Sequence, residues 1–147
     1  MKYLKFAAAV FLLMLIAAGC SKKYPDYEQY INDIINAQDE FLSRIGSASS
    51  AEDIAASAEW FSVRLLELDK SGRSLKEKYP ESAGWESAPP ESLKDDWIRF
   101  HAKWSEFEER WNLEISGDHS YQRMLYDPEV REAFMKLART MDSVSFL

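Results

Sequence analysis

Residues 51–79, AEDIAASAEWFSVRLLELDKSGRSLKEKY, decide the fold class. Along this stretch, apolar residues and one glycine recur at alternating steps of three and four. The positions are Ala51, Ile54, Ala58, Phe61, Leu65, Leu68, Gly72, Leu75 and Tyr79. Because an α-helix has about 3.6 residues per turn, these residues share one face of a helix. An unbroken track of this length predicts a helix that packs along other helices at a shallow angle.

Three further stretches show the same periodicity. We call the line of apolar residues along each predicted helix its seam. The seam of the first stretch is Tyr27, Ile31, Ile34, Phe41 and Ile45, interrupted by Gln38. The seam of the third is Leu93, Trp97, Phe100, Trp104, Phe107 and Trp111, and that of the last is Val130, Phe134, Leu137, Met141 and Val144. No part of the chain after the N-terminal segment alternates β-branched residues for long enough to form a sheet. We therefore predict an all-α fold, a four-helix up-down bundle over residues 27–147.

Residues that start and stop helices agree with these limits. Ser49 and Glu52 form a capping box for the second helix, and Asp127 with Pro128 is an N-cap followed by proline in the first turn. The other signals are Gly46 after the first helix, Pro80 after the second, Pro89 and Pro90 before the third, and Gly117 after it. The predicted linkers are about residues 46–50, 80–90 and 116–127.

Gly72 carries a prediction about helix neighbours, because its heptad neighbours on the seam are larger. A glycine at this position leaves space that a large aromatic ring from a neighbouring helix can fill. If the second and third helices are antiparallel neighbours, we expect Trp97 or Phe100 to cover Gly72.

The N-terminal segment has the properties of an export signal. Lys2 and Lys5 precede residues 7–18, which carry no charge. This apolar run is shorter than the ~20 residues that a transmembrane helix needs, and the polar Ser21 follows closely. The pattern predicts a signal peptide over residues 1–19.

Residues 16–20, Ile-Ala-Ala-Gly-Cys, resemble the lipobox of bacterial lipoproteins. The family most often has Leu three places before the cysteine, where this chain has Ala17. The resemblance implies cleavage before Cys20, a lipid anchor (diacylglycerol, palmitate) on that residue, and a tether over residues 20–26. With Ser21 next, it implies the periplasmic face of the outer membrane in a Gram-negative cell. The alternative is cleavage elsewhere, with Cys20 as a free or buried thiol.

Composition excludes several classes of protein. Cys20 is the only cysteine, so neither an intramolecular disulfide nor a covalently attached c-type haem can form. Cleavage would also remove Lys2 and Lys5, taking the formal charge from −7 to −9. Because an acidic chain without a basic stripe repels phosphate, we expect no nucleic-acid partner.

A search for catalytic groups finds few candidates. Histidine occurs only as His101 and His119, and neither has a glutamate three residues before it, so zinc and di-iron sites are not expected. His101 is either an axial ligand or proton carrier, or a boundary residue packed on Trp97. The carboxylates Glu106, Glu108, Glu109 and Glu114 form an acid/base pair, a cation site or, with Arg99, Lys103 and Arg110, a mixed solvated face. We expect no cofactor, no metal and no enzyme.

Two aromatic features remain as candidate binding sites. The stripe with Trp104 and Phe107 either fills the core or lines a slot for an apolar ligand. Trp85, in a polar linker, either marks a partner-binding surface or plugs the open end of the bundle. The sequence thus predicts a membrane-anchored, protein-binding or envelope-accessory module with an unidentified envelope protein as partner. A carrier of an apolar ligand or lipid is the alternative.

Overall fold

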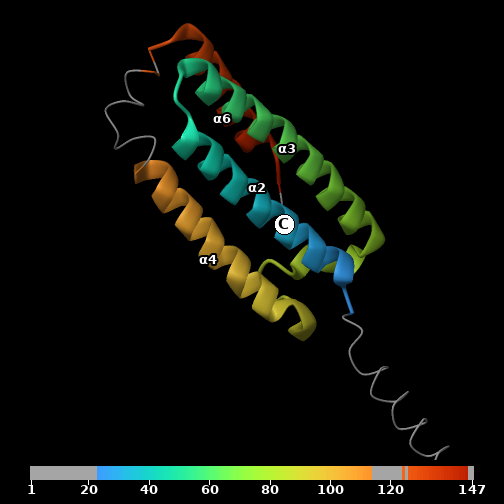
Figure 1. Ribbon diagram of the computed structural model, residues 1–147. Coiled ribbons are helices and arrows are strands. Elements are labelled where there is room, and N and C mark those ends of the chain that lie inside the picture. Colours follow the sequence, from blue (N-terminus) through green and yellow to red (C-terminus); the bar gives the residue numbers. More distant parts are fainter. Residues whose placement is uncertain (1–22, 114–123, 125, 146–147) are drawn as a thin grey trace, which may run out of the picture.

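A computed structural model describes residues 23–113, 124 and 126–145 of the chain. Within this part, four long helices and two short 3₁₀ turns form the fold, with no strand (Figure 1). The helices are α2 (Pro25–Ser47), α3 (Ala51–Lys78), α4 (Lys94–Trp111) and α6 (Pro128–Ser143), and the 3₁₀ turns are η2 (Pro80–Gly84) and η3 (Glu91–Leu93). The all-α prediction is therefore confirmed. The predicted signal peptide, Cys20, Glu114, Gly117 and His119 lie outside the described residues.

The four helices alternate in direction. Phe41 in α2 stacks on Phe61 in α3 with ring centroids 4.4 Å apart, and Tyr27 lies 5.7 Å from Tyr79. The early part of one helix thus meets the late part of the other, so α2 and α3 are antiparallel. In Figure 1, α4 runs in the direction of α2 and α6 in the direction of α3, which confirms the up-down bundle.

The order of the helices around the bundle differs from the order along the chain. α4 packs against α2, and α6 packs against α3. Both pairs are parallel. In α2 and α4, the late residues Phe41 and Phe107 lie 6.3 Å apart, and the earlier residue Arg99 donates to Asn32 across 2.7 Å. In the other pair, Ser145, just after α6, donates its backbone N–H to Asp69, late in α3. The α3 and α4 helices are therefore diagonal, and Figure 1 shows them on opposite sides of α2.

This arrangement corrects the premise of the prediction for Gly72. That prediction took the second and third helices as neighbours, but Trp97 and Phe100 belong to a helix that packs on α2. Gly72 is buried on α3 one turn after Asp69. Near this point α3 meets the segment that follows α6, because the backbone N–H of Ser145 donates to the Asp69 carboxylate across 3.2 Å.

The helix ends follow local hydrogen bonding and differ from the sequence prediction at several places. The first helix continues through Gly46 to Ser47, so the predicted stop at Gly46 is wrong. The N-cap of α3 is Ser50, whose side chain accepts from the Asp53 N–H across 3.1 Å, so the predicted capping box at Ser49 is wrong by one residue. The Asp53 carboxylate accepts from both the backbone N–H and the hydroxyl of Ser49. At α6 the prediction is confirmed, since Asp127 accepts from the Glu129 N–H across 2.9 Å.

The first helix buries more of its surface than one stripe. Besides the predicted positions, Tyr30, Ile35, Ala37 and Leu42 are buried, because α2 contacts both α3 and α4. It also begins at Pro25, and Tyr24 before it is only 6% exposed. The folded body therefore starts before the predicted boundary at Tyr27.

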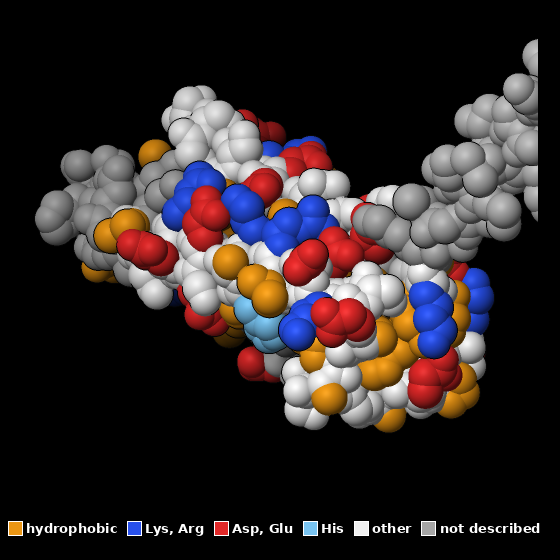
Figure 2. Space-filling view, turned by 90° about the horizontal axis from the view of Figure 1, so that it is seen from below, with side chains coloured by type: hydrophobic (Ala, Val, Ile, Leu, Met, Phe, Trp, Pro, Cys, Tyr) orange, Lys and Arg blue, Asp and Glu red, His pale blue; other side chains and the backbone are white. Residues whose placement is uncertain are grey.

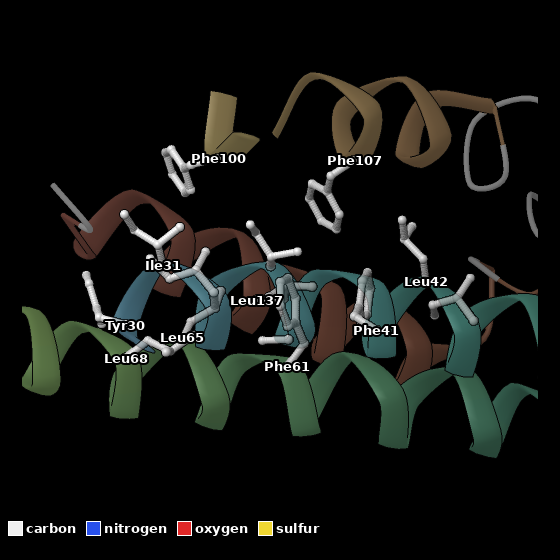
Figure 3. Close-up of a cluster of buried hydrophobic side chains, with 14 of the residues drawn as sticks. Tyr30, Ile31, Phe41, Leu42, Phe61, Leu65, Leu68, Phe100, Phe107 and Leu137 are labelled. Atoms are coloured by element: carbon white, nitrogen blue, oxygen red, sulfur yellow. The ribbon is translucent and has the colours of Figure 1, made fainter. Parts of the chain in front are cut away.

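The core lies where these helices face one another. Figure 3 shows Phe100 and Phe107 pointing from α4 toward side chains of α2 and α3, among them Ile31 and Phe61. No helix in the described part of the chain has both the length and the apolar character needed to cross a bilayer.

Candidate functional site

The candidate site is a cavity on the side of the bundle where α4 faces α6. These helices are not a closely packed pair, although Trp111 and Phe134 meet with ring centroids 5.9 Å apart. From this contact toward the start of α4 and the end of α6, a cavity of about 170 Å³ opens. All four helices and the residue after α6 contribute to its lining: Ile34, Gln38, Phe61, Leu65, Trp104, Phe107, Met141 and Val144.

Gln38 is the one polar residue in this lining. Its side chain is 3% exposed, and its Oε1 has no hydrogen-bond partner within the described part of the chain. A buried acceptor left without a donor costs about 1–3 kcal/mol relative to one that is hydrogen-bonded. The lining is therefore apolar apart from Gln38, and the carbonyl oxygen of Gln38 itself has almost no accessible surface.

The aromatic wall of the cavity is fixed by its neighbours. Trp104 is partly buried, and its Nε1 donates to Glu108 Oε1 across 2.9 Å. Phe107 is 4% exposed and lies 5.9 Å from Phe61 and 6.3 Å from Phe41 (Figure 3). The aromatic wall of the cavity is thus built from rings that also pack on the core.

The opposite wall is positioned by a buried carboxylate on α3. Asp69 is 6% exposed, and it pairs with Arg73 Nη2 at 2.6 Å and accepts from the Ser145 N–H. This second bond holds the backbone next to Val144, which lines the cavity. Burial raises the pKa of nearby Tyr30, and the charge of Asp69 raises it further. The contacts of Asp69 thus stabilise the fold, and Asp69 is not among the residues that line the cavity.

The structure places Trp85 inside the fold. Its ring is 7% exposed and lies 4.6 Å from the Tyr24 ring and 4.9 Å from the Tyr27 ring, measured between centroids. The linker after α3 crosses the end of the bundle to reach α4, which is diagonal to α3. Of the two interpretations of Trp85, this burial agrees with the plug at the end of the bundle, and a role for the residue in partner binding stays a prediction.

His101 lies at the boundary of the aromatic stripe. It is exposed, with its ring 5.4 Å from Phe100 and 6.4 Å from Trp97. This is the position that the boundary interpretation expects. Within residues 23–113, 124 and 126–145, no three His, Cys, Asp or Glu side chains gather closely enough to hold a metal ion.

The predicted carboxylates on α4 lie on a solvated face with basic residues. Lys103 Nζ donates to Glu106 across 2.8 Å, and this bond lowers the pKa of the Glu106 carboxyl. Glu108 and Glu109 are exposed. A general acid would need a raised pKa, so the shift at Glu106 favours the interpretation as a mixed surface.

The surface away from the cavity mixes charged and apolar side chains on the face drawn in Figure 2. Figure 2 shows acidic and basic side chains intermixed on one face, with hydrophobic side chains between them. Exposed large apolar residues occur on several elements: Val63, Leu66, Ile98, Leu113, Tyr126 and Met135. A wide, open groove between α3 and α6 carries acidic residues such as Glu52 and Glu132 beside Lys136 and Arg139. Neither feature forms a defined site.

Comparison of the chain with protein-family models, with curated proteins and with solved structures gives no match.

Sequence reasoning placed every lining residue of the cavity on one of the four apolar tracks, including the break at Gln38. It did not bring these residues together. The missing information was the order of the helices around the bundle, which sets Met141 and Val144 opposite Trp104. The broad apolar face of α2, visible in the sequence at Tyr30, Ile35 and Leu42, was the signal that two helices pack on it.

Proposed function

We propose that this chain is a lipid-anchored bacterial envelope protein whose helical bundle is a binding module. The observation that carries the proposal is the cavity between α4 and α6, which has apolar walls and no titratable group in its lining. Acid/base or nucleophilic catalysis needs such groups within reach of the substrate. An apolar pocket with one polar group instead suits recognition.

The lipid anchor comes from the sequence around Cys20. An anchor there would hold the start of α2 near the membrane, since Lys23 is three residues away and each residue spans at most ~3.6 Å. The end of the bundle that contains Trp85 and Tyr79 would then face the headgroups. Gln38 lies 13 residues into the helix that begins at Pro25, which places it ~20 Å further from the membrane. The cavity would thus be open to a partner in the envelope.

A carrier of apolar molecules is the second candidate, and the position of the cavity on the aromatic stripe favours it. Its size limits the cargo. Pockets for drug-sized ligands measure roughly 300–1,000 Å³, whereas an apolar cavity of about 150 Å³ accommodates benzene. With about 170 Å³, this cavity fits one ring or a short alkyl group, which is less than a whole lipid chain.

The anchor is tested by changing Cys20→Ser and following the protein in a bacterial host. The parent should incorporate a labelled fatty acid and partition into detergent, and the variant should do neither while keeping its helical circular dichroism spectrum. In a Gram-negative host, a matched Ser21→Asp variant should stay lipidated and move to the inner membrane. Unchanged processing and attachment of the Cys20 variant would refute the lipoprotein assignment.

Binding is tested separately by placing a photo-crosslinking residue at Met141, beside the cavity, and at Met135, on the exposed side of α6. The proposal expects adducts from Met141 in intact cells and far fewer from Met135. Equal crosslinking at both positions would show that the cavity side of the bundle is not the binding surface.

A further inference from the structure

We infer that the segment after α6 is a latch that closes one end of the cavity between α4 and α6. In this latch, the ring of Phe146 packs on Gly72 of α3, and Val144 forms part of the cavity wall. Phe146 follows the last described residue, so the inference names the docking site of its side chain. It rests on the proposed role of the cavity as a binding site and adds how a ligand gains access to it.

The first step is the register between this segment and α3. The backbone N–H of Ser145 donates to Asp69 Oδ1 across 3.2 Å, which sets these two residues opposite each other. The chain reaches this point in the direction of α3, because α6 is parallel to α3 (Figure 1). Gly72 lies three residues, or ~4.5 Å, further along the axis of α3, and one residue of extended chain advances ~3.3 Å. One step beyond Ser145 therefore brings Phe146 to the level of Gly72.

The second step is the direction of the side chains. Val144 has extended backbone angles, with φ −98° and ψ 148°, and the side chains of an extended chain alternate between two faces. Val144 is partly buried and lines the cavity, whereas Ser145 is exposed. The same alternation puts Phe146 on the face of Val144, so its ring is directed into the bundle.

The third step is the space at Gly72. This residue is buried, and its neighbours on the seam of α3, Leu68 and Leu75, carry larger side chains. The α6 helix ends at Ser143, two residues before the contact with Asp69, so it stops short of Gly72. Without a Cβ, a glycine lets another group approach the helix backbone closely. Gly72 is thus a notch that suits an aromatic ring from the segment after α6.

The latch controls access because Val144 belongs to the cavity wall but not to a helix. Met141 is held by the backbone hydrogen bonds of α6, whereas Val144 depends on the bond between Ser145 and Asp69 and on the packing of Phe146. Release of this segment moves Val144 away and opens that end of the cavity. Such a short segment can open without unfolding the bundle, so ligand exchange depends on its release.

The contact is tested in the mature chain carrying Cys20→Ser, which stays in water without detergent. We expect nuclear Overhauser effects between the ring protons of Phe146 and the α protons of Gly72. Phe146→Ala should lower the midpoint of urea unfolding by ~1 M, as for a lost buried ring. Leu147→Ala is the matched control, because the alternation puts this side chain on the opposite face, and it should change the midpoint much less.

The docking site is identified by Gly72→Leu in two backgrounds. In the parent the new side chain displaces the ring of Phe146 and should lower the midpoint of urea unfolding. In the Phe146→Ala variant it fills the space that the ring has left and should raise the midpoint. Circular dichroism establishes that each variant is folded.

Access to the cavity is tested with indole, a neutral ring system of about the size that the cavity admits. NMR relaxation dispersion measures its dissociation rate. We expect indole to leave the Phe146→Ala variant at least ten-fold faster than the parent, and to leave Leu147→Ala at the rate of the parent.

The inference is overturned if no Overhauser effect joins Phe146 to Gly72, or if Gly72→Leu has the same effect in both backgrounds. An equal dissociation rate in the parent and Phe146→Ala overturns the control of access. A parent that shows the Overhauser effect but binds no indole refutes the binding function of the cavity, and the control of access with it, while the contact itself is established. The two failures are therefore distinguishable.

Discussion

Replacing Trp85 by alanine should destabilise the bundle strongly, because the structure makes this ring part of the core. The ring is 7% exposed and contacts Tyr24 and Tyr27 at the end of the bundle. A buried tryptophan removes ~150–250 Å² from water, which at ~25 cal/mol per Å² contributes about 4–6 kcal/mol as an upper limit. Alanine substitutions at buried aromatic residues cost ~3–5 kcal/mol, so we expect a loss in that range.

The assay is equilibrium urea unfolding followed by circular dichroism at 222 nm. A domain of this size has a free energy of unfolding of ~5–15 kcal/mol, so the expected loss would move the midpoint far toward lower urea. Leu66→Ala, at a side chain that is 51% exposed, is the control and should change stability by ~0.5 kcal/mol or less. A Trp85 variant that unfolds with the parent would refute the plug and return this residue to the candidates for partner binding.

Three further predictions concern single contacts. Gln38→Met should stabilise the fold by ~1–2 kcal/mol in urea unfolding, because it removes a buried acceptor that has no donor. A destabilised variant would mean that Gln38 Oε1 accepts a hydrogen bond in solution. Ser50→Ala should cost ~1 kcal/mol as the loss of an N-cap, and Ser49→Ala should cost clearly less; the reverse order would restore the sequence prediction. The pKa of Asp26 is lowered, chiefly by the hydrogen bond that its carboxylate accepts from Lys78. The pair therefore stabilises the fold fully at pH values above the ordinary carboxyl pKa near 3.8, and this contribution is lost as the pH falls through the lowered pKa of Asp26. NMR titration should show the pKa of Asp26 rising toward 3.8 in a Lys78→Met variant, and an unchanged value would contradict the assignment.

The sequence predicted the helices well because their periodicity is strong and local. The tracks through Phe61 and Phe107 and the capping at Asp127 depend on residues within a few turns of one another. The capping residue of α3 was misplaced because Ser49 and Ser50 are both good caps, and only the backbone geometry selects between them.

The order of the helices could not be predicted from the seams alone. Any two apolar stripes of similar width can pack, so the seam of the second helix did not say whether its neighbour was the third helix or the last. The long linker with Trp85 crosses the end of the bundle, and this allows α4 to pack on α2. The cavity exists because of that order, and so the candidate site was not predictable from spacing.

The central claim is that the cavity between α4 and α6 is the ligand site, and methyl NMR tests it most directly. With the Cys20→Ser chain and saturating indole, the account predicts large shifts for the methyl groups of Met141 and Val144, which line the cavity. It predicts almost none for Met135, which is 57% exposed on the same helix. Shifts spread equally over the methyl signals of these three residues, or absent from all of them, would contradict the account.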